Sequence, residues 1–362
     1  MLRTRLSSGI IAILLMLASP ALAGSDRALT PETINGATFE DAPRKASGTP
    51  DPFIVKAQVL LSRHNISPGE IDGLDGENYR KAIAQFRRQN NLAAGDTMDS
   101  ETWQALSASQ AGEIITQYRL TRKDAETRYP RRIPRDFARQ ARMKRLDYTS
   151  AREMLAERFH MSPGLLSALN PRARFRKADE TIQVAAPNRQ RPEGAVERIE
   201  AVKATGMLVV YGKGDAILAS YPATIGSETT PSPEGDYKVR RVALDPPYHY
   251  DPEKNFQQGQ NRKKLVLPPG PNNPAGSVWI GLSKPTFGIH GTPEPSQVSK
   301  TSSHGCVRLT NWDVAELASL VKPGVRMRFV NDPPPEAGTA ALSSAVPETK
   351  GPDGQRPGTK RP

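Results

Sequence analysis

The chain has 362 residues, which allows two or three domains, and 37% of them are hydrophobic. Apart from the short stretch at 10–17, no run is apolar enough to be considered as a membrane span, so a membrane-spanning protein is not expected. The formal net charge of +12 predicts an anionic partner: nucleic acid, an anionic wall polymer or a membrane surface.

The first 23 residues have the organisation of a signal peptide. Arg3 and Arg5 form a basic start. Residues 10–17 are apolar but too few to span a bilayer, and Ala-Leu-Ala at 21–23 matches the small-x-small cleavage rule. We therefore expect cleavage near Ala23 and a periplasmic mature protein. The alternative, the N-terminal helix of a cytoplasmic protein, does not account for the cleavage motif.

Residues 24–50 are expected to be a flexible lead to a first domain at 51–110. In that domain apolar residues recur at helical spacing in VKAQVLL and YRKAIAQF, and Asp99 can cap a third short helix. With its IDG turn, A-x-x-x-F helix and terminal T-W-x-x-L, the stretch resembles the small three-helix peptidoglycan-binding domain. The resemblance implies an all-α domain that binds peptidoglycan. A domain that only docks on its neighbour would show the same core.

A basic segment follows at 111–145. Between Arg119 and Arg145, eleven Lys or Arg residues face three Asp or Glu residues. Aromatic residues are not interleaved at stacking spacing, so binding of single-stranded nucleic acid is not favoured. For an exported protein the positive charge indicates an anionic wall polymer or a membrane surface, and we expect no nucleic-acid partner. We expect a basic linker or helical segment, for which a solvated helical face is the plain alternative to an anion-binding surface.

The unit at 146–190 is predicted to be a small α+β module. Ser150 and Glu153 form a capping box at one helix start, and Ser162-Pro163 opens a second helix with leucines along one face. With its helix pair and the LN before a return strand, the unit resembles a LysM module, although the usual first strand and GDT turn are degenerate. The resemblance implies binding to glycans that contain N-acetylglucosamine.

Residues 194–332 are predicted to be a mainly β domain, because MLVVY, AILASYPATIG, DYKVRRVAL, SVWIGL, FGIH and RMRFV have strand patterns and do not alternate with helices. One helix is predicted after the cysteine, with Thr310 and Asp313 as its capping box and Pro323-Gly324 after its end. A glycine-rich phosphate loop is missing, so a nucleotide-binding sheet is not expected. Residues 333–362 are expected to be a disordered tail.

Cys306 is the only cysteine, so it cannot form a disulfide within the chain. Three interpretations compete. It is a small buried hydrophobe, a metal ligand with His249, His290 and His304, for which the spacing is poor, or a nucleophile that uses His290 or His304 as a base. The neighbouring Arg308 and a helix start four residues on favour the thiolate, and hence the nucleophile.

Separated motifs around the cysteine then point to one family. SPEGDYKV, LPPGPNNPAGSVWIGLS, GIHGTP and SSHGCVRL follow one another in this order. Together they resemble the signature of the L,D-transpeptidase (YkuD-type) catalytic domain over nearly all of 198–332. The resemblance implies a β-sandwich with one helix after the cysteine. It also implies acyl transfer on peptidoglycan stem peptides without a cofactor or metal.

The same resemblance implies roles for single residues. Cys306 would attack the carbonyl of the third residue of a tetrapeptide stem and release D-alanine. His290 would act as general base and then as acid, oriented by the backbone carbonyl of Gly291. Backbone N–H groups around His304 and Gly305 would form the oxyanion hole.

Further residues are expected to contact the substrate: Ser303, Arg308, Tyr248, His249 and Tyr250. Arg308 would either hold a substrate carboxylate or anchor its loop to the sheet. Tyr248, His249 and Tyr250 belong to a segment at 245–260 that is rich in Pro and aromatic residues. We interpret this segment as a lid over the cleft, and the alternative is that it is a surface loop whose side chains only pack. Trp279 is expected in the core.

The acyl acceptor stays open at this stage. An amine of a second stem would give a 3→3 cross-link, water would give an L,D-carboxypeptidase, and an amine of an outer-membrane protein would anchor that protein to the wall. A different class of function is a non-enzymatic peptidoglycan-binding scaffold, which the binding-like N-terminal half and the basic segment favour. The complete set of His290, His304 and Cys306 favours the enzyme.

Overall fold

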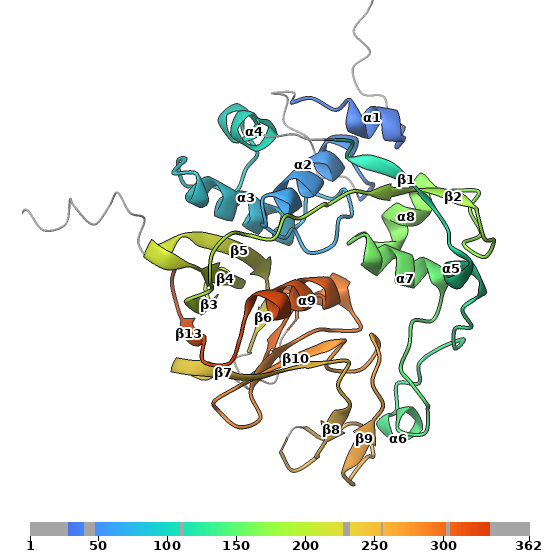
Figure 1. Ribbon diagram of the computed structural model, residues 1–362, viewed down its shortest axis with the longest axis vertical. Coiled ribbons are helices and arrows are strands. Elements are labelled where there is room, and N and C mark those ends of the chain that lie inside the picture. The colour runs from blue at the N-terminus through green and yellow to red at the C-terminus, as the bar shows by residue number, and fades with distance from the viewer. Residues whose placement is uncertain are drawn as a thin grey trace, which may run out of the picture.

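The computed structural model describes residues 28–39, 48–108, 112–226, 232–254, 256–301 and 305–333 (Figure 1). The predicted signal peptide and all but the first residue of the predicted tail lie outside these ranges. Within the described ranges, the helices are too short or too polar to cross a membrane.

Four helices begin the described chain: α1 (Pro31–Asn35), α2 (Pro52–Arg63), α3 (Glu77–Gln89) and α4 (Ser100–Ser107). The three helices predicted between 51 and 110 are α2, α3 and α4, and Asp99 caps α4 as expected by accepting from the backbone N–H of Thr102. The prediction of a flexible lead is wrong for residues 28–39. They contain α1, whose Ile34 is completely buried, and they are ordered because Ile34 and Ala37 enter the core while Leu29 and Phe39 pack against it.

The next part combines a small sheet with two main helices. Its elements are β1 (Ile115–Arg119), α5 (Arg122–Glu126), α6 (Phe137–Gln140), α7 (Ala151–Arg158), α8 (Pro163–Leu169) and β2 (Thr181–Ala185). Strand β1 pairs with β2 in antiparallel orientation. The segment at 111–145 is therefore not only a linker, since it supplies a strand that the α+β module at 146–190 needs for its sheet.

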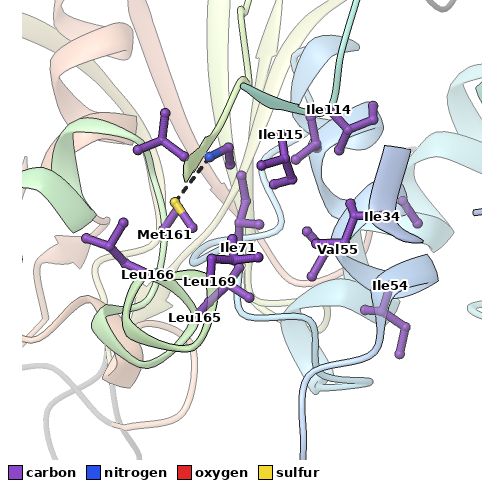
Figure 2. Packing of buried hydrophobic residues seen from close by; sticks show 14 of the residues in the cluster. Ile34, Ile54, Val55, Ile71, Ile114, Ile115, Met161, Leu165, Leu166 and Leu169 are labelled. Carbon is purple, nitrogen blue, oxygen red and sulfur yellow. Dashed lines mark hydrogen bonds between the residues drawn. The ribbon is translucent and has the colours of Figure 1, made fainter. Parts of the chain in front are cut away.

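These two parts share one hydrophobic core. Ile34 of α1, Val55 of α2 and Ile71 pack in the same cluster as Met161 and the leucines of α8 (Figure 2). The sulfur of Met161 also accepts a hydrogen bond from the backbone N–H of Ala185 at 3.2 Å. The two predicted modules are consequently a single packed body rather than independent units, because neither covers its own apolar face.

The remaining residues form a nine-stranded mixed sheet and one helix. The strands are β3 (Arg198–Val202), β4 (Met207–Tyr211), β5 (Ile217–Pro222), β6 (Thr224–Ile225), β7 (Gly235–Leu244), β10 (Val278–Leu282), β11 (Gly288–His290), β12 (Val307–Arg308) and β13 (Arg326–Val330). A separate hairpin, β8 (Tyr248–Tyr250) with β9 (Leu265–Leu267), projects beside α6 (Figure 1). Short 3₁₀ turns lie at Lys213–Asp215 and Pro295–Gln297.

The nine strands run in the order β5-β4-β3-β13-β7-β10-β11-β12-β6. The two edge strands, β5 and β6, are separated in sequence only by Ala223. The sheet must therefore bend until its two edges meet, which encloses a core between its halves as in a barrel or sandwich. The buried residues of that core include Ile199, Val239 and Met327. The predicted mainly β fold is confirmed.

Helix α9 (Asn311–Leu320) packs on β10 and β11 and begins where predicted. Thr310 caps it by accepting from the backbone N–H of Asp313 at 3.1 Å. The carboxylate of Asp313 does not complete a capping box. It accepts hydrogen bonds from Arg189 at 2.8 Å and from the hydroxyl of Ser67 at 2.9 Å instead. A capping residue of the sheet domain thus binds residues from the N-terminal body.

Candidate active site

Strand pairing brings the predicted nucleophile and base to one face of the sheet. Strands β11 and β12 are parallel, with Ile289 opposite Val307 and His290 opposite Arg308. Both Ile289 and Val307 are completely buried in the core. Because side chains alternate along a strand, Cys306, Arg308 and His290 lie on the other face.

Two contacts hold the ring of His290. Its Nδ1 lies 2.7 Å from the backbone carbonyl oxygen of Gly291 and donates to it, which leaves Nε2 as an acceptor. The ring also stacks on Trp279, with centroids 5.5 Å apart and planes inclined by 17°. The indole of Trp279 packs against Gly288, which must be a glycine because an added Cβ would come within 2.6 Å of the indole. Trp279, expected in the core, is a half-buried neighbour of the base instead.

The surroundings of His290 keep the ring neutral. Burial, together with the positive charge of Arg308, lowers the pKa of His290 to about 4, while the hydrogen bond to Gly291 opposes the shift. A neutral ring at near-neutral pH has an unprotonated Nε2. His290 is therefore able to accept a proton without first losing one.

Cys306 is half-buried, and its Sγ lies 3.7 Å from the backbone carbonyl oxygen of Thr286, to which the thiol donates. Burial raises the pKa of the Cys306 thiol, although a backbone contact with Gly288 and the charge of Arg308 lower it. The expectation that the neighbourhood favours the thiolate is therefore wrong for this structure, because the desolvation of a buried charge outweighs the nearby cation. The pair rests as thiol and imidazole.

Arg308 is a half-buried cation that acts electrostatically on both reactive groups. It interacts electrostatically with Cys306, Glu294 and Tyr248, and burial lowers the pKa of its guanidinium. Its Nε has no hydrogen-bond partner in the described part of the chain, nor do its other nitrogens form an ion pair there. A buried donor without a partner costs free energy, which a substrate oxygen would recover.

Gly305 precedes the cysteine in a left-handed conformation, with φ of 95°. Its carbonyl oxygen accepts a hydrogen bond of 3.1 Å from the hydroxyl of the buried Ser232. Because the peptide group is planar, this bond also fixes the direction of the Cys306 N–H. Ser232 lies in the SPEG segment, but its residue type alone did not indicate this role. Ser303 and His304 lie outside the described residues.

The predicted lid residues separate into different environments. Tyr248 is half-buried, and burial and the nearby Cys306 raise its pKa to about 12. His249 is exposed. The prediction of Tyr250 as a rim contact is wrong: it is 1% exposed, and its hydroxyl donates to the carbonyl of Asn261 at 2.9 Å. Tyr250 belongs to the small core under the hairpin, together with Phe137 of α6.

Asn311, the first residue of α9, connects the base to the N-terminal body. Its Oδ1 accepts from the backbone N–H of Ser277 at 3.1 Å and lies where a Cβ on Gly291 would be, at 2.2 Å. Its Nδ2 donates to Glu157 of α7 at 3.0 Å. Asn311 thus packs directly behind the carbonyl-bearing residue that orients His290. The sequence offered no signal for it beyond its place at a helix start.

Possible metal ligands do not gather in the described ranges, where no three His, Cys, Asp or Glu side chains come close enough to hold an ion. His290 and Cys306 are instead arranged with a cation, an acceptor nitrogen and a thiol on one face. Such a set is suited to proton transfer from sulfur to nitrogen and to attack on a carbonyl carbon.

Sequence comparisons assign the domain that carries these residues to a known family. Residues 197–330 match the model of the YkuD L,D-transpeptidase catalytic domain, and residues 50–106 match that of a peptidoglycan binding domain. YkuD of Bacillus licheniformis, whose name assigns it to the L,D-transpeptidases, is 30% identical to this chain over 175 residues. The match covers 48% of this chain and 90% of that protein. The chain belongs to the YkuD family of L,D-transpeptidases. Both family predictions are confirmed.

Other L,D-transpeptidases are also similar to this chain. YbiS of Escherichia coli K12, also named for the L,D-transpeptidases, is 30% identical over 145 residues, which cover 39% of this chain and 47% of that protein. A solved L,D-transpeptidase from Xylanimonas cellulosilytica covers 80% of this chain and all of its own, at 14% identity and a TM-score of 0.36. L,D-transpeptidase 3 of Mycobacterium tuberculosis with a faropenem-derived adduct aligns at 13% identity and a TM-score of 0.32, over 42% of this chain and 75% of its own. The family assignment rests on the sequence matches alone.

Proposed function

We propose that the chain is a peptidoglycan L,D-transpeptidase with Cys306 as its nucleophile and His290 as its general base. The observation that carries the proposal is the anchored imidazole. Its Nδ1 donates to the carbonyl of Gly291, which leaves Nε2 unprotonated, and the strand register places His290 on the same side of the sheet as Cys306. Family membership supports an enzyme that acts on peptidoglycan, and the acyl-transfer step is our inference from this geometry.

In the proposed first step, the Cys306 proton moves to Nε2 of His290 while the sulfur attacks the carbonyl carbon of the third stem residue. The carbonyl π electrons move to oxygen, and the N–H of Cys306, held in direction by Ser232, is one donor to that oxyanion. The C–N bond to D-alanine then breaks. The imidazolium returns its proton to the leaving amine, and a thioester remains.

In the second step an amine attacks the thioester, loses its proton to His290 and forms the new amide, while the thiol is restored. We propose the amine of a second stem as the acceptor, which gives a 3→3 cross-link. Water, for a carboxypeptidase, and an amine of an outer-membrane protein are the alternatives. Arg308 is proposed to bind a substrate carboxylate, because its Nε has no partner among the described residues. We further propose export to the periplasm, on the basis of the signal-peptide pattern.

The test is acylation of the full mature chain by a stem tetrapeptide or a carbapenem, followed by intact mass. The parent protein is expected to gain the mass of the acyl group, and Cys306→Ala is expected to remain unmodified with an unchanged circular dichroism spectrum. His290→Gln is expected to slow acylation by about 10²–10⁴-fold, the usual contribution of a general base.

Acylation of Cys306→Ala at the parental rate would reject the nucleophile. A parent protein that binds sacculi but neither forms an adduct nor changes their muropeptides would support the scaffold alternative. Analysis of muropeptides after incubation with sacculi identifies the acceptor, since cross-linked dimers, tripeptides and protein-bound stems differ in mass.

A further inference from the structure

A cavity that lies far from Cys306 in sequence is found in the part built by α5, α7 and α8. These helices lie beside one another on one side of the molecule (Figure 1). The cavity has a volume of about 870 Å³. Three segments border it: the loop after α5, the start of α7 and the loop from α8 to β2. Its volume is in the range that accommodates a ligand of several hundred daltons.

Four arginines line this cavity: Arg131, Arg152, Arg174 and Arg176. The described residues of its lining include no Asp or Glu. All four side chains are exposed, and within the described ranges none of them forms an ion pair. Arg152 Nη1 makes one weak hydrogen bond of 3.3 Å to Ser167. The four guanidinium groups are therefore not paired with carboxylates in the described ranges, and Glu180 accepts only from the backbone N–H of Arg174, at 3.0 Å.

The walls of the cavity are held in place independently of the arginines. The Asn170 side chain donates to the carbonyl of Gln183 at 2.8 Å and accepts from its N–H at 2.7 Å, which ties the loop after α8 to strand β2. Phe175, in the same loop, is 7% exposed and belongs to the shared hydrophobic core. The loop that carries Arg174 and Arg176 is consequently preformed, so binding does not require ordering it.

We propose that this arginine cavity binds peptidoglycan through the carboxylates of its stem peptides, as a second site apart from the catalytic one. Guanidinium groups bind carboxylates with two parallel hydrogen bonds, and a stem peptide carries several carboxylates along a short chain. The half-buried Tyr129 also lines the cavity and supplies apolar surface. A neutral glycan would not use four positive charges. This inference rests on the proposed function, which identifies the polymer as peptidoglycan. It adds that the stem-peptide carboxylates are the groups recognised.

The experiment measures binding of the full chain in the Cys306→Ala background, so that ligand is not consumed. The probes are soluble glycan oligomers with tetrapeptide stems, the same oligomers with amidated carboxylates, and glycan oligomers without peptides. Calorimetry at 0.15 M salt is expected to give binding with the first probe only. Raising the salt to 1 M is expected to weaken it, because exposed charges are screened.

The arginines are tested by Arg152→Glu with Arg174→Glu, which is expected to weaken binding at least about tenfold, as reversal of two charge-assisted contacts requires. The conservative pair Arg152→Lys with Arg174→Lys retains the charge and is expected to lose less. The matched control is Arg142→Glu with Lys144→Glu, two exposed positions outside the cavity lining, which is expected to change affinity less than about twofold.

Equal binding of amidated or peptide-free glycan would overturn the proposal, as would unchanged affinity in the Arg152 and Arg174 variant. Binding of anionic lipopolysaccharide but not of the stem-bearing oligomers would also overturn it. Failure of the catalytic proposal is seen separately. The charge-reversal pair, placed in the chain that retains Cys306, is expected to be acylated by a carbapenem at the parental rate.

Discussion

At the scale of single residues, the reactive pair is defined by desolvation. Cys306 and His290 both lie in surroundings where the charged form is costly, so the pKa of the thiol is raised and that of the imidazole is lowered to about 4. The resting state is a neutral pair. A pre-formed thiolate–imidazolium pair would require the opposite shifts. The carbonyl of Gly291 then selects which ring nitrogen stays open for the proton.

This leads to a prediction for the pH dependence of acylation. The base must be unprotonated, and its pKa of about 4 means that it stays so down to about pH 5. The second-order rate constant is therefore expected to be flat from pH 7 to pH 5 and to fall with a midpoint near 4, well below the ordinary value of about 6.5 for histidine. The rate constant at each pH is measured by quenching the acylation reaction at intervals and determining the acylated fraction by intact-mass spectrometry.

The control for this profile is circular dichroism at each pH, which shows whether the chain is still folded. Arg308→Gln removes a cation that lowers the pKa of His290, so its midpoint is expected to move upward. A parental midpoint between 6 and 7 would contradict the buried, neutral base.

At the scale of elements, short segments acquire their structure from the surfaces they cover. Helix α1 has only five residues, too few to be stable alone. Thr30 caps it and Ile34 enters the core, and Asn35 donates to the carbonyl of Ile115 in β1. Strand β1 likewise finds its partner β2 across a gap of more than 60 residues. Local sequence patterns do not reveal such distant partners.

Ile34→Ala is expected to destabilise the protein by about 2–4 kcal/mol, the usual cost of emptying a fully buried position. A flexible lead would make the same substitution neutral. Chemical denaturation followed by circular dichroism measures the difference in free energy of unfolding. The neighbouring Glu32→Ala, at an exposed position of α1, is the control and is expected to cost less than about 0.5 kcal/mol.

At the scale of the whole molecule, the helical body is fastened to the sheet domain by buried polar contacts. The side chains of Arg189 and Asp313 are 7% and 0% exposed and lie 2.8 Å apart. Arg189 also binds Ser62 of α2 and Glu316 of α9. In a further contact between the two parts, Lys81 of α3 donates at 2.6 Å to Ser299, in the loop between His290 and Cys306. The domain that matches the peptidoglycan-binding family is thus packed against the catalytic domain and is not joined to it only by a flexible linker.

Arg189→Leu is expected to destabilise the protein by about 3–5 kcal/mol, because it leaves Asp313 charged and buried without its cation. Combining it with Asp313→Leu removes that charge and is expected to recover part of the loss. The exposed Arg191→Leu, which loses only a hydrogen bond to the carbonyl of Ser319, is the matched control. Urea denaturation measures the free energy of unfolding of the parent protein, the two single variants and the double variant.

If the two parts unfold independently, the Arg189 variant would shift only one of two transitions. A single transition that moves as a whole is expected, since the polar contacts and the packing of Trp312 on His160 join the parts. A parental protein with two separate transitions would contradict this account.

The sequence by itself determined the local elements and the chemical motifs. Helical and strand spacing located α2, α3, α4 and the main strands, and Thr310 marked the start of α9, because these signals depend on neighbours along the chain. The order of motifs around His290 and Cys306 indicated the family that the comparisons confirm. The LysM resemblance of 146–190 stays a prediction.

Only the tertiary structure decided what depends on partners distant in sequence. In it, Trp279 stacks on the ring of His290 and Tyr250 is buried in a small core. The hydroxyl of Ser232 donates a hydrogen bond to the carbonyl of Gly305. It merged the two N-terminal modules around one core and raised the pKa of the thiol that the sequence had indicated as a thiolate. The physical reason is common to all of these: burial and pairing energies arise between residues that folding, not sequence, brings together.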